Sequence, residues 1–334
     1  MSVQPPTLIW NGEEKRPRAG MRITAFLLIQ SFLLLAVSAS VGAVLLTFSD
    51  SGASPSTLSP ATEAVDVRLI SAVTTLLAAL ASVWIAGRLL DRRPFVDYGF
   101  ALSWDWLRGW LFGIFAGGVV ITGVFLLQWS LGWMQITGTF WTSGASTFAL
   151  IGPILFFALA AFAEDLIYWG YLLTNLSEGL ASSTLGWRLP VILSLVAVSS
   201  FFALGHALNP DATVLSTLNI AVAGVMLALG YVLTGQLAIT LGIHFSWNLF
   251  QGYVFGFPVS GLDPTGATLV SIQQRGPELW NGGPFGPEAG ILGLVAMLMV
   301  CIIVFLRAWF RGEASISHAV ADYRPSTRNS IHTE

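Results

Sequence analysis

Two adjacent carboxylates stand within an apolar stretch of this chain. Glu164 and Asp165 lie in the sequence AFAEDLIYWGY. An ionised side chain at the middle of a membrane helix costs about 2.5–3.5 kcal/mol, so such a residue needs a partner or a chemical task. Two other apolar stretches each contain a histidine: His206 in SSFFALGHALNP, and His244 in LGIHFSWNLF, where Asn248 follows. These few polar side chains are the candidates for chemistry.

Helical spacing predicts which of these side chains share a face. Residues four apart on a helix are neighbours on its surface. Three pairs have this spacing: Glu164 with Tyr168, Phe202 with His206, and His244 with Asn248. In the second pair a phenyl ring lies beneath an imidazole. Three helices are therefore able to direct one carboxylate, two imidazoles and one carboxamide at a common point.

Two mechanisms of amide hydrolysis fit this set of groups. Glu164, His206 and His244 are suitable ligands for Zn²⁺, which leaves an open position for a water molecule that ionises near a pH of about 7. Alternatively, Glu164 is a general base without a metal, and a histidine polarises the attacked carbonyl. Other interpretations remain open, because intramembrane histidines and asparagines often join helices, and carboxylate pairs occur in the proton pathways of transporters.

Composition requires that the elements holding these residues are membrane helices. Of 334 residues, 54% are hydrophobic and 10% are charged, against about 25% charged in a soluble domain. The apolar runs lack the alternation of a lipid-facing barrel. Because a span needs ~20 apolar residues, we predict an all-α polytopic membrane bundle of about eight transmembrane helices, at about 23–48, 67–90, 107–131, 147–175, 189–208, 214–233, 237–257 and 290–308.

The basic residues predict the orientation of this bundle. With a cytoplasmic N-terminus, all Lys and Arg residues except Arg68 and Arg275 fall on the cytoplasmic side. This distribution predicts that both termini are cytoplasmic in a bacterial inner membrane. The net charge of −3 does not indicate a nucleic-acid partner. The predicted partners are the lipid bilayer and a membrane-associated peptide or protein substrate.

The order of these motifs resembles that of a known family. Glu-Asp, then Phe-x-x-x-His, then His-x-x-x-Asn is similar to the CPBP (CAAX protease and bacteriocin-processing, or Abi) intramembrane proteases, relatives of the Ras-converting CAAX endopeptidase. EDLIYWGYLL looks like the family's E-E-x-x-x-R-G stretch, and SSFFALGHALNP like its second motif. LGIHFSWNLFQGYVFGFPVSG and NGGPFGPEAG are similar to the bacterial branch. The resemblance covers about residues 150–292.

The resemblance implies roles for the candidate residues. Glu164 would activate water, and His206 would help to hold that water or a metal. His244 and Asn248 would bind the metal, for which Zn²⁺ is the candidate, or would stabilise the oxyanion. The implied function is an intramembrane endopeptidase acting on a membrane-associated substrate, with a prenylated peptide as one candidate. The alternative is a weak or inactive member that serves as a membrane scaffold or as a bacteriocin self-immunity factor.

Composition predicts the domain organisation, and the resemblance implies the extent of the protease core. Residues 21–312 form the transmembrane domain, with a protease core at about 147–292. Residues 1–20 are predicted to be a disordered cytoplasmic arm, and residues 313–334 a similar cytoplasmic tail. The segment 256–289, which is rich in Gly and Pro, is either a structured cap over the bundle or a flexible loop.

The chain departs from the family pattern at two linked positions. Asp165 stands in place of the second Glu, and Trp169 in place of the Arg. An ion pair between these positions is therefore impossible, and a buried carboxylate without a partner does not persist ionised. We expect either that the indole N–H of Trp169 donates to Asp165 or that Asp165 is protonated, and that Asp165→Asn leaves folding and activity nearly intact.

Overall fold

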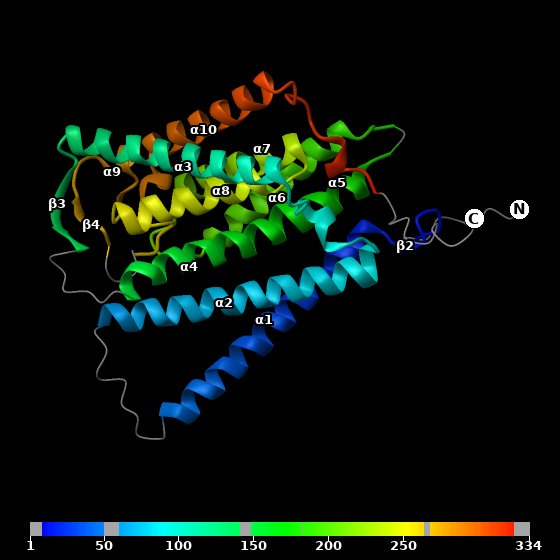
Figure 1. Ribbon diagram of the computed structural model, residues 1–334, viewed down its shortest axis with the longest axis horizontal. Coiled ribbons are helices and arrows are strands. Elements are labelled where there is room, and N and C mark those ends of the chain that lie inside the picture. Colours follow the sequence, from blue (N-terminus) through cyan, green and yellow to red (C-terminus); the bar gives the residue numbers. More distant parts are fainter. Residues whose placement is uncertain (1–8, 50–59, 141–147, 183, 264–267, 324–334) are drawn as a thin grey trace, which may run out of the picture.

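The protein is a bundle of helices, as predicted from its composition. The computed structural model describes residues 9–49, 60–140, 148–182, 184–263 and 268–323 (Figure 1). The eight predicted spans correspond to α1 (Ala19–Ser49), α2 (Pro60–Ala86), α3 (Trp104–Ser130), α4 (Phe148–Asp165), α6 (Arg188–His206), α7 (Val214–Thr234), α8 (Ala238–Asn248) and α10 (Ile291–Phe310). Within the described ranges, seven helices are long and apolar enough to cross a membrane. The chain is therefore a multi-pass, all-α membrane protein.

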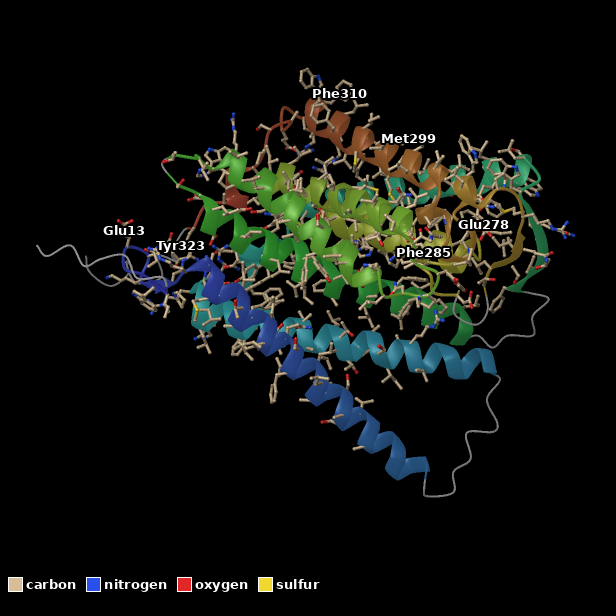
Figure 2. The ribbon with its side chains drawn as sticks, turned by 180° about the vertical axis from the view of Figure 1, so that it is seen from behind. Glu13, Glu278, Phe285, Met299, Phe310 and Tyr323 are labelled. Atoms are coloured by element: carbon tan, nitrogen blue, oxygen red, sulfur yellow. The ribbon has the colours of Figure 1, made fainter. Side chains whose placement is uncertain are left out.

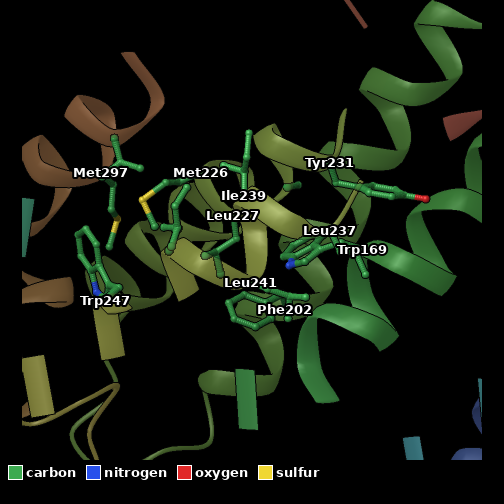
Figure 3. Close-up of a cluster of buried hydrophobic side chains, with 14 of the residues drawn as sticks. Trp169, Phe202, Met226, Leu227, Tyr231, Leu237, Ile239, Leu241, Trp247 and Met297 are labelled. Carbon is green, nitrogen blue, oxygen red and sulfur yellow. The ribbon is translucent and has the colours of Figure 1, made fainter. Parts of the chain in front are cut away.

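The exception among the eight is α8, which is short because it lies inside the bundle. It has 11 residues and continues into the six-residue η6 (Leu249–Val254). Nearly all of its side chains are buried, including Ile243 and Trp247. Figure 3 shows the buried side chains around it, which come from several helices and include Phe202 and Met297. A helix surrounded by protein does not need the length of a lipid-exposed one.

Glycines allow α3 and α8 to approach closely. A Cβ on Gly113 of α3 would lie 2.4 Å from the carbonyl oxygen of Ile239, and one on Gly242 of α8 would lie 2.3 Å from that of Trp110. Real Cβ contacts are never this short, so the two backbones touch only because both positions lack side chains. This contact fixes the helix that carries His244.

Three segments of the bundle have the wider π-helical turn. They are η2 (Gly87–Asp91), which follows α2, η5 (Leu166–Leu173), which joins α4 to α5 (Thr174–Leu180), and η6, which follows α8. π-Helical segments are rare and are frequently found at functional sites. Here η5 begins directly after Asp165, and η6 directly after Asn248.

A structured cap covers one end of the bundle. The strands β3 (Met134–Thr139) and β4 (Val270–Gln274) pair antiparallel, with a bulge between Ile136 and Gly138. The short helices α9 (Glu278–Asn281), η7 (Gly283–Phe285) and η8 (Pro287–Ala289) follow and lead into α10. The cap interpretation of 256–289 is thus confirmed over the described residues of that segment.

The opposite end of the bundle holds the two terminal segments together. β1 (Trp10–Asn11) pairs with β2 (Arg16–Pro17), and Arg16 is fully buried, 2.9 Å from Glu178. The Arg16 guanidinium lies 3.2 Å from the centre of the Tyr323 ring, beyond η9 (His318–Val320). In Figure 2, Glu13 and Tyr323 lie at one end of the molecule and Glu278 near the other.

This arrangement corrects the prediction for the arm. The disorder predicted for residues 1–20 is wrong for residues 9–20, and the similar prediction for the tail is wrong for residues 313–323. Glu178 explains the order, because three guanidinium groups, those of Arg16, Arg22 and Arg93, surround its carboxylate. A buried charge is stable only when it is paired, so these residues hold the arm against α5. The remaining predicted disorder lies outside the described residues.

Replacing Gly113 should loosen the α3–α8 contact. The added Cβ of Gly113→Ala must displace the α8 backbone, so we expect it to destabilise the protein by ~1–3 kcal/mol. Gly123→Ala, on the same helix, is the control, because nothing lies within 4 Å of its Cβ position. It should be neutral or stabilise by ~0.5–1 kcal/mol. Thermal unfolding in detergent compares the two; equal midpoints would contradict the close contact.

Candidate active site

Six of the eight candidate side chains line a single cavity of about 350 Å³. The cavity lies between α4, α6, α7, α8 and the cap. Its polar and aromatic lining includes Glu164, Tyr168, Phe202, His206, His244 and Asn248. The other two candidates, Asp165 and Trp169, are fully buried behind this wall. Residues from three separate stretches of sequence therefore meet at one hollow in the bundle.

Asp165 holds the imidazole of His244. Its Oδ1 is 2.8 Å from Nδ1 of His244, which binds α4 to α8. The indole N–H of Trp169 donates to the same Oδ1 at 3.1 Å, as predicted. The bond to His244 was not predicted, and it gives Asp165 a second partner. With Nδ1 directed at the carboxylate, Nε2 of His244 faces the cavity.

Glu164 lies on the cavity side of the same pair of helices. Its Oε2 is 3.7 Å from Nε2 of His244, beyond hydrogen-bond distance. The Glu164 side chain is 35% exposed, whereas that of Asp165 is 0% exposed. Two adjacent carboxylates thus have different environments: one is accessible from the cavity, and the other is fixed in the wall. Asn248 completes this side of the cavity one helical turn from His244.

His206 reaches the cavity from the opposite side, at the end of α6. Its Nδ1 is 2.8 Å from the carbonyl oxygen of Phe202. A carbonyl only accepts, so Nδ1 carries the proton, and Nε2 of the neutral ring has a free lone pair. The Phe202 ring lies 4.4 Å from the His206 ring and 6.4 Å from the His244 ring. One aromatic side chain therefore contacts both imidazoles. The predicted contact of Phe202 with His206 is present, but the two rings are tilted by 50° and are not stacked.

The cap contributes a carboxylate that sequence reasoning missed. Glu288 of η8 is 4% exposed and lines the cavity. Its Oε2 accepts from the backbone N–H of Ser260 at 2.6 Å and from the Ser260 hydroxyl at 3.1 Å. Ser260 has a φ of +50°, and the following Gly261 has a φ of +80°. These two positive values form a tight turn, which directs the N–H and hydroxyl of Ser260 at Glu288. The sequence NGGPFGPEAG indicated a buried acid at this position, because Glu288 is the one acid among glycines, prolines and apolar residues in this stretch.

An arginine from α2 also lines the cavity. Arg68 was predicted on the outer side, and its Nη1 donates to the carbonyl oxygen of Asp263 at 2.6 Å. Both residues line the cavity. Arg68 thus ties α2 to the cap.

The donor set does not complete a zinc site. A catalytic zinc takes three protein ligands. Over the ranges that the structure describes, no three His, Cys, Asp or Glu side chains are grouped closely enough to hold a metal ion. Glu164 and His244 are close neighbours, but His206 is not joined to them. Zinc therefore stays a prediction from the sequence, and we derive no step through a metal.

Comparison with known families identifies the segment that carries this cavity. Residues 146–250 match the family model described as type II CAAX prenyl endopeptidase Rce1-like. This segment is therefore similar to that family, which confirms the predicted resemblance over these residues. No curated protein and no solved structure matches the chain. The match includes Glu164, His206, His244 and Asn248, while Glu288 lies beyond it.

The buried carboxyl of Glu288 should make stability depend on pH. Burial raises its pKa, although the two donors of Ser260 act in the opposite direction. The folded state then binds the proton more tightly than the unfolded chain, whose Glu pKa is about 4.3. Its contribution to stability is complete below that value and is lost as pH rises through the raised pKa.

Glu288→Gln removes this dependence. We expect the thermal unfolding midpoint of the wild type to fall relative to that of Glu288→Gln as pH is raised from about 5 to about 9. Glu278→Gln, at an exposed position in the same cap, should keep a constant difference from the wild type. If the difference in unfolding midpoint between the wild type and Glu288→Gln does not change with pH, or changes in the opposite direction, the raised pKa is contradicted.

Proposed function

We propose that this protein is an intramembrane endopeptidase that hydrolyses a peptide bond of a membrane-associated substrate. The observation that carries this proposal is the convergence of Glu164, His206, His244 and Asn248 on one cavity, with His244 fixed by Asp165. Peptide hydrolysis needs a base for water and donors for an oxyanion. Both kinds of group are present, and the Rce1-like match supports a protease-type enzyme.

Glu164 activates the water in this mechanism. It is the accessible carboxylate of the pair, and the 3.7 Å between Oε2 and His244 Nε2 leaves it free to accept a proton from a water molecule in the cavity. Nε2 of His206, the unprotonated nitrogen of its ring, accepts the other hydrogen of that water from the opposite side. The activated oxygen attacks the carbonyl carbon, and Glu164 later returns the proton to the leaving amine nitrogen.

His244 and Asn248 stabilise the negative oxygen that forms on the attacked carbonyl. Protonated His244 donates from Nε2, and the Asn248 amide donates beside it. The Asp165 carboxylate favours the protonated imidazole and fixes its orientation, as the aspartate of a catalytic triad does. The hydrogen bond from Trp169 replaces one donor of the arginine in the family pattern, so the departure at Trp169 leaves Asp165 with two partners.

The cavity walls favour an apolar substrate segment. Besides the polar groups, they consist largely of apolar side chains from α4, α7 and the cap, among them Phe156, Phe157, Ile220, Met226 and Leu262. A prenylated peptide is the first candidate, since the Rce1-like match is to CAAX prenyl endopeptidases. The concentration of arginines at the end opposite the cap supports a cytoplasmic location for both termini in a bacterial inner membrane.

Substitution of the proposed base and oxyanion donor tests the function. We expect Glu164→Gln and His244→Ala each to lower kcat roughly 10²–10⁴-fold on a prenylated peptide or on a library of membrane proteins. Glu278→Gln, an exposed acid of the cap, should cleave like the wild type. The measurement is product formation by the full-length protein in vesicles. Undiminished cleavage by both variants refutes the mechanism, and a phenotype that survives both without any cleavage identifies a scaffold or immunity factor.

Asp165→Asn should be far more damaging than the sequence alone predicts. Asparagine cannot stabilise the protonated imidazole, and its amide donor would face Nδ1 and favour the wrong tautomer. We expect kcat to fall roughly 10²–10⁴-fold, with a smaller change in KM. Trp169→Phe removes only the indole donor and is the matched control, with a loss of tenfold or less, roughly one hydrogen bond. Equal activity of Asp165→Asn and wild type would mean that the His244 contact has no catalytic role.

A further inference from the structure

A second cavity lies at the C-terminal end of α2, whereas Arg68, near the start of α2, lines the first. Its volume is about 200 Å³, and it is formed where α2 passes into η2 and the chain turns into η3 (Phe95–Tyr98). Two guanidinium groups, those of Arg88 and Arg93, line it together with Trp84. Acidic side chains are absent from the described lining. The cavity therefore has the charge and the dimensions to take an anion.

Arg93 lines this cavity and is largely buried. The residue is 7% exposed, and its Nη2 pairs with Glu178. Its Nε is enclosed by protein and has no hydrogen-bond partner among the described residues, so this nitrogen does not reach the cavity. Arg93 therefore contributes positive charge to the wall of the cavity and not a free donor.

Arg88 stands at the rim and faces solvent or lipid headgroups. It is exposed, and within the described part of the chain its guanidinium has no ion pair or hydrogen bond assigned to it. The Tyr98 ring packs closely against the preceding residue, Gly87, whose Cβ would lie 3.1 Å from that ring. The site is therefore built from two elements and is not a loose surface arginine.

An apolar stripe leads along α2 to this cavity. Val73, Leu77 and Trp84 are 40%, 53% and 58% exposed, and their spacing continues to Arg88 on one face of the helix. In a multi-pass membrane protein this face contacts lipid. Tryptophan marks the interface between hydrocarbon and headgroups, so the cavity lies at the depth of the phosphates.

We propose that this cavity binds the phosphate of an anionic phospholipid from the adjacent leaflet, with one acyl chain along the Val73–Leu77–Trp84 face. The phosphate accepts from Arg88 at the rim and lies beside the positive charge of Arg93, and guanidinium groups suit phosphate better than ammonium groups do. The lipid joins α2 to the segment that leads to Glu178 and the terminal arm. This proposal is independent of the catalytic one.

A comparison within the protein supports the choice of this cavity. Another hollow of about 360 Å³, beside α3 and α10, also contains two arginines, Arg307 and Arg311. There, however, Asp105 and Glu313 line the same wall, and Arg311 pairs with both. Its charges are already balanced within that lining, whereas the described lining of the cavity at Arg88 contains no acidic side chain.

Lipid retention by the full-length protein in detergent tests the proposal. Native mass spectrometry would measure binding of phosphatidylglycerol and of phosphatidylcholine with equal acyl chains. We expect the wild type to retain phosphatidylglycerol preferentially. Arg88→Gln should weaken that binding about fivefold, the equivalent of ~1 kcal/mol for one arginine near a lipid surface. Arg88→Lys should keep part of the phosphatidylglycerol binding that Arg88→Gln loses. Arg108→Gln is the control, because Arg108 is also exposed but pairs with Asp105.

A second measurement distinguishes a lipid from a free anion. Phosphatidylglycerol should raise the thermal unfolding midpoint of the wild type and of Arg108→Gln but not that of Arg88→Gln. Inorganic phosphate at matched ionic strength should have little effect on any of them. Equal lipid binding by wild type and Arg88→Gln, or equal losses for Arg88→Gln and Arg108→Gln, would overturn the proposal. Stabilisation by inorganic phosphate as large as that by lipid would show a free-anion site instead.

Discussion

The hydrogen bond between Asp165 and His244 is the interaction on which the candidate active site depends. It joins α4 to α8 in a part of the protein where both partners are almost completely buried. Water does not compete with such a bond, so it is stronger than at a surface, and it would be costly to leave unmade. Because Nδ1 is held by the carboxylate, Nε2 points at the cavity that also contains Glu164. The close α3–α8 contact at Gly113 and the Trp169 indole keep the two partners in place.

The π-helical segments explain how these side chains reach their partners. An α-helix would carry its regular 3.6-residue pattern past Asp165 and Asn248, whereas η5 and η6 begin at the next residue in each case. The wider turn adds a residue to the helix and rotates everything that follows. Backbone distortion of this kind is tolerated in a membrane only inside protein, and here it lies at the inner walls of the cavity. Glu164, Asp165, His244 and Asn248 therefore occupy the last regular turns before these two distortions.

The two ends of the bundle perform different tasks. At the cap end, Glu288, Ser260 and Arg68 close the cavity and connect α2 to the loops. At the other end, buried arginines surround Glu178 and hold the terminal segments, and the phosphate-sized cavity beside Arg93 continues that network toward the lipid. At each end, polar groups form hydrogen bonds and ion pairs with neighbouring groups, because the interior of the bundle and the surrounding hydrocarbon provide no water to solvate them. A charge left without a partner at either end would destabilise the fold by several kcal/mol, on the order of a substantial part of its stability.

The sequence by itself determined the membrane, the helices and the identity of the main candidates. Hydrophobic length is a local property, and an acid or a histidine in an apolar run is conspicuous because burial without a partner is unfavourable. Helical spacing also sufficed for the contact between Phe202 and His206 and for the Trp169–Asp165 bond, since both are contacts within one segment. Only the tertiary structure decided that Asp165 binds His244, that Glu288 enters the cavity from the cap, and that Arg16 orders the arm against Glu178. These contacts join residues far apart in the chain, and their existence depends on how the helices are placed in space, which no local pattern of residues contains.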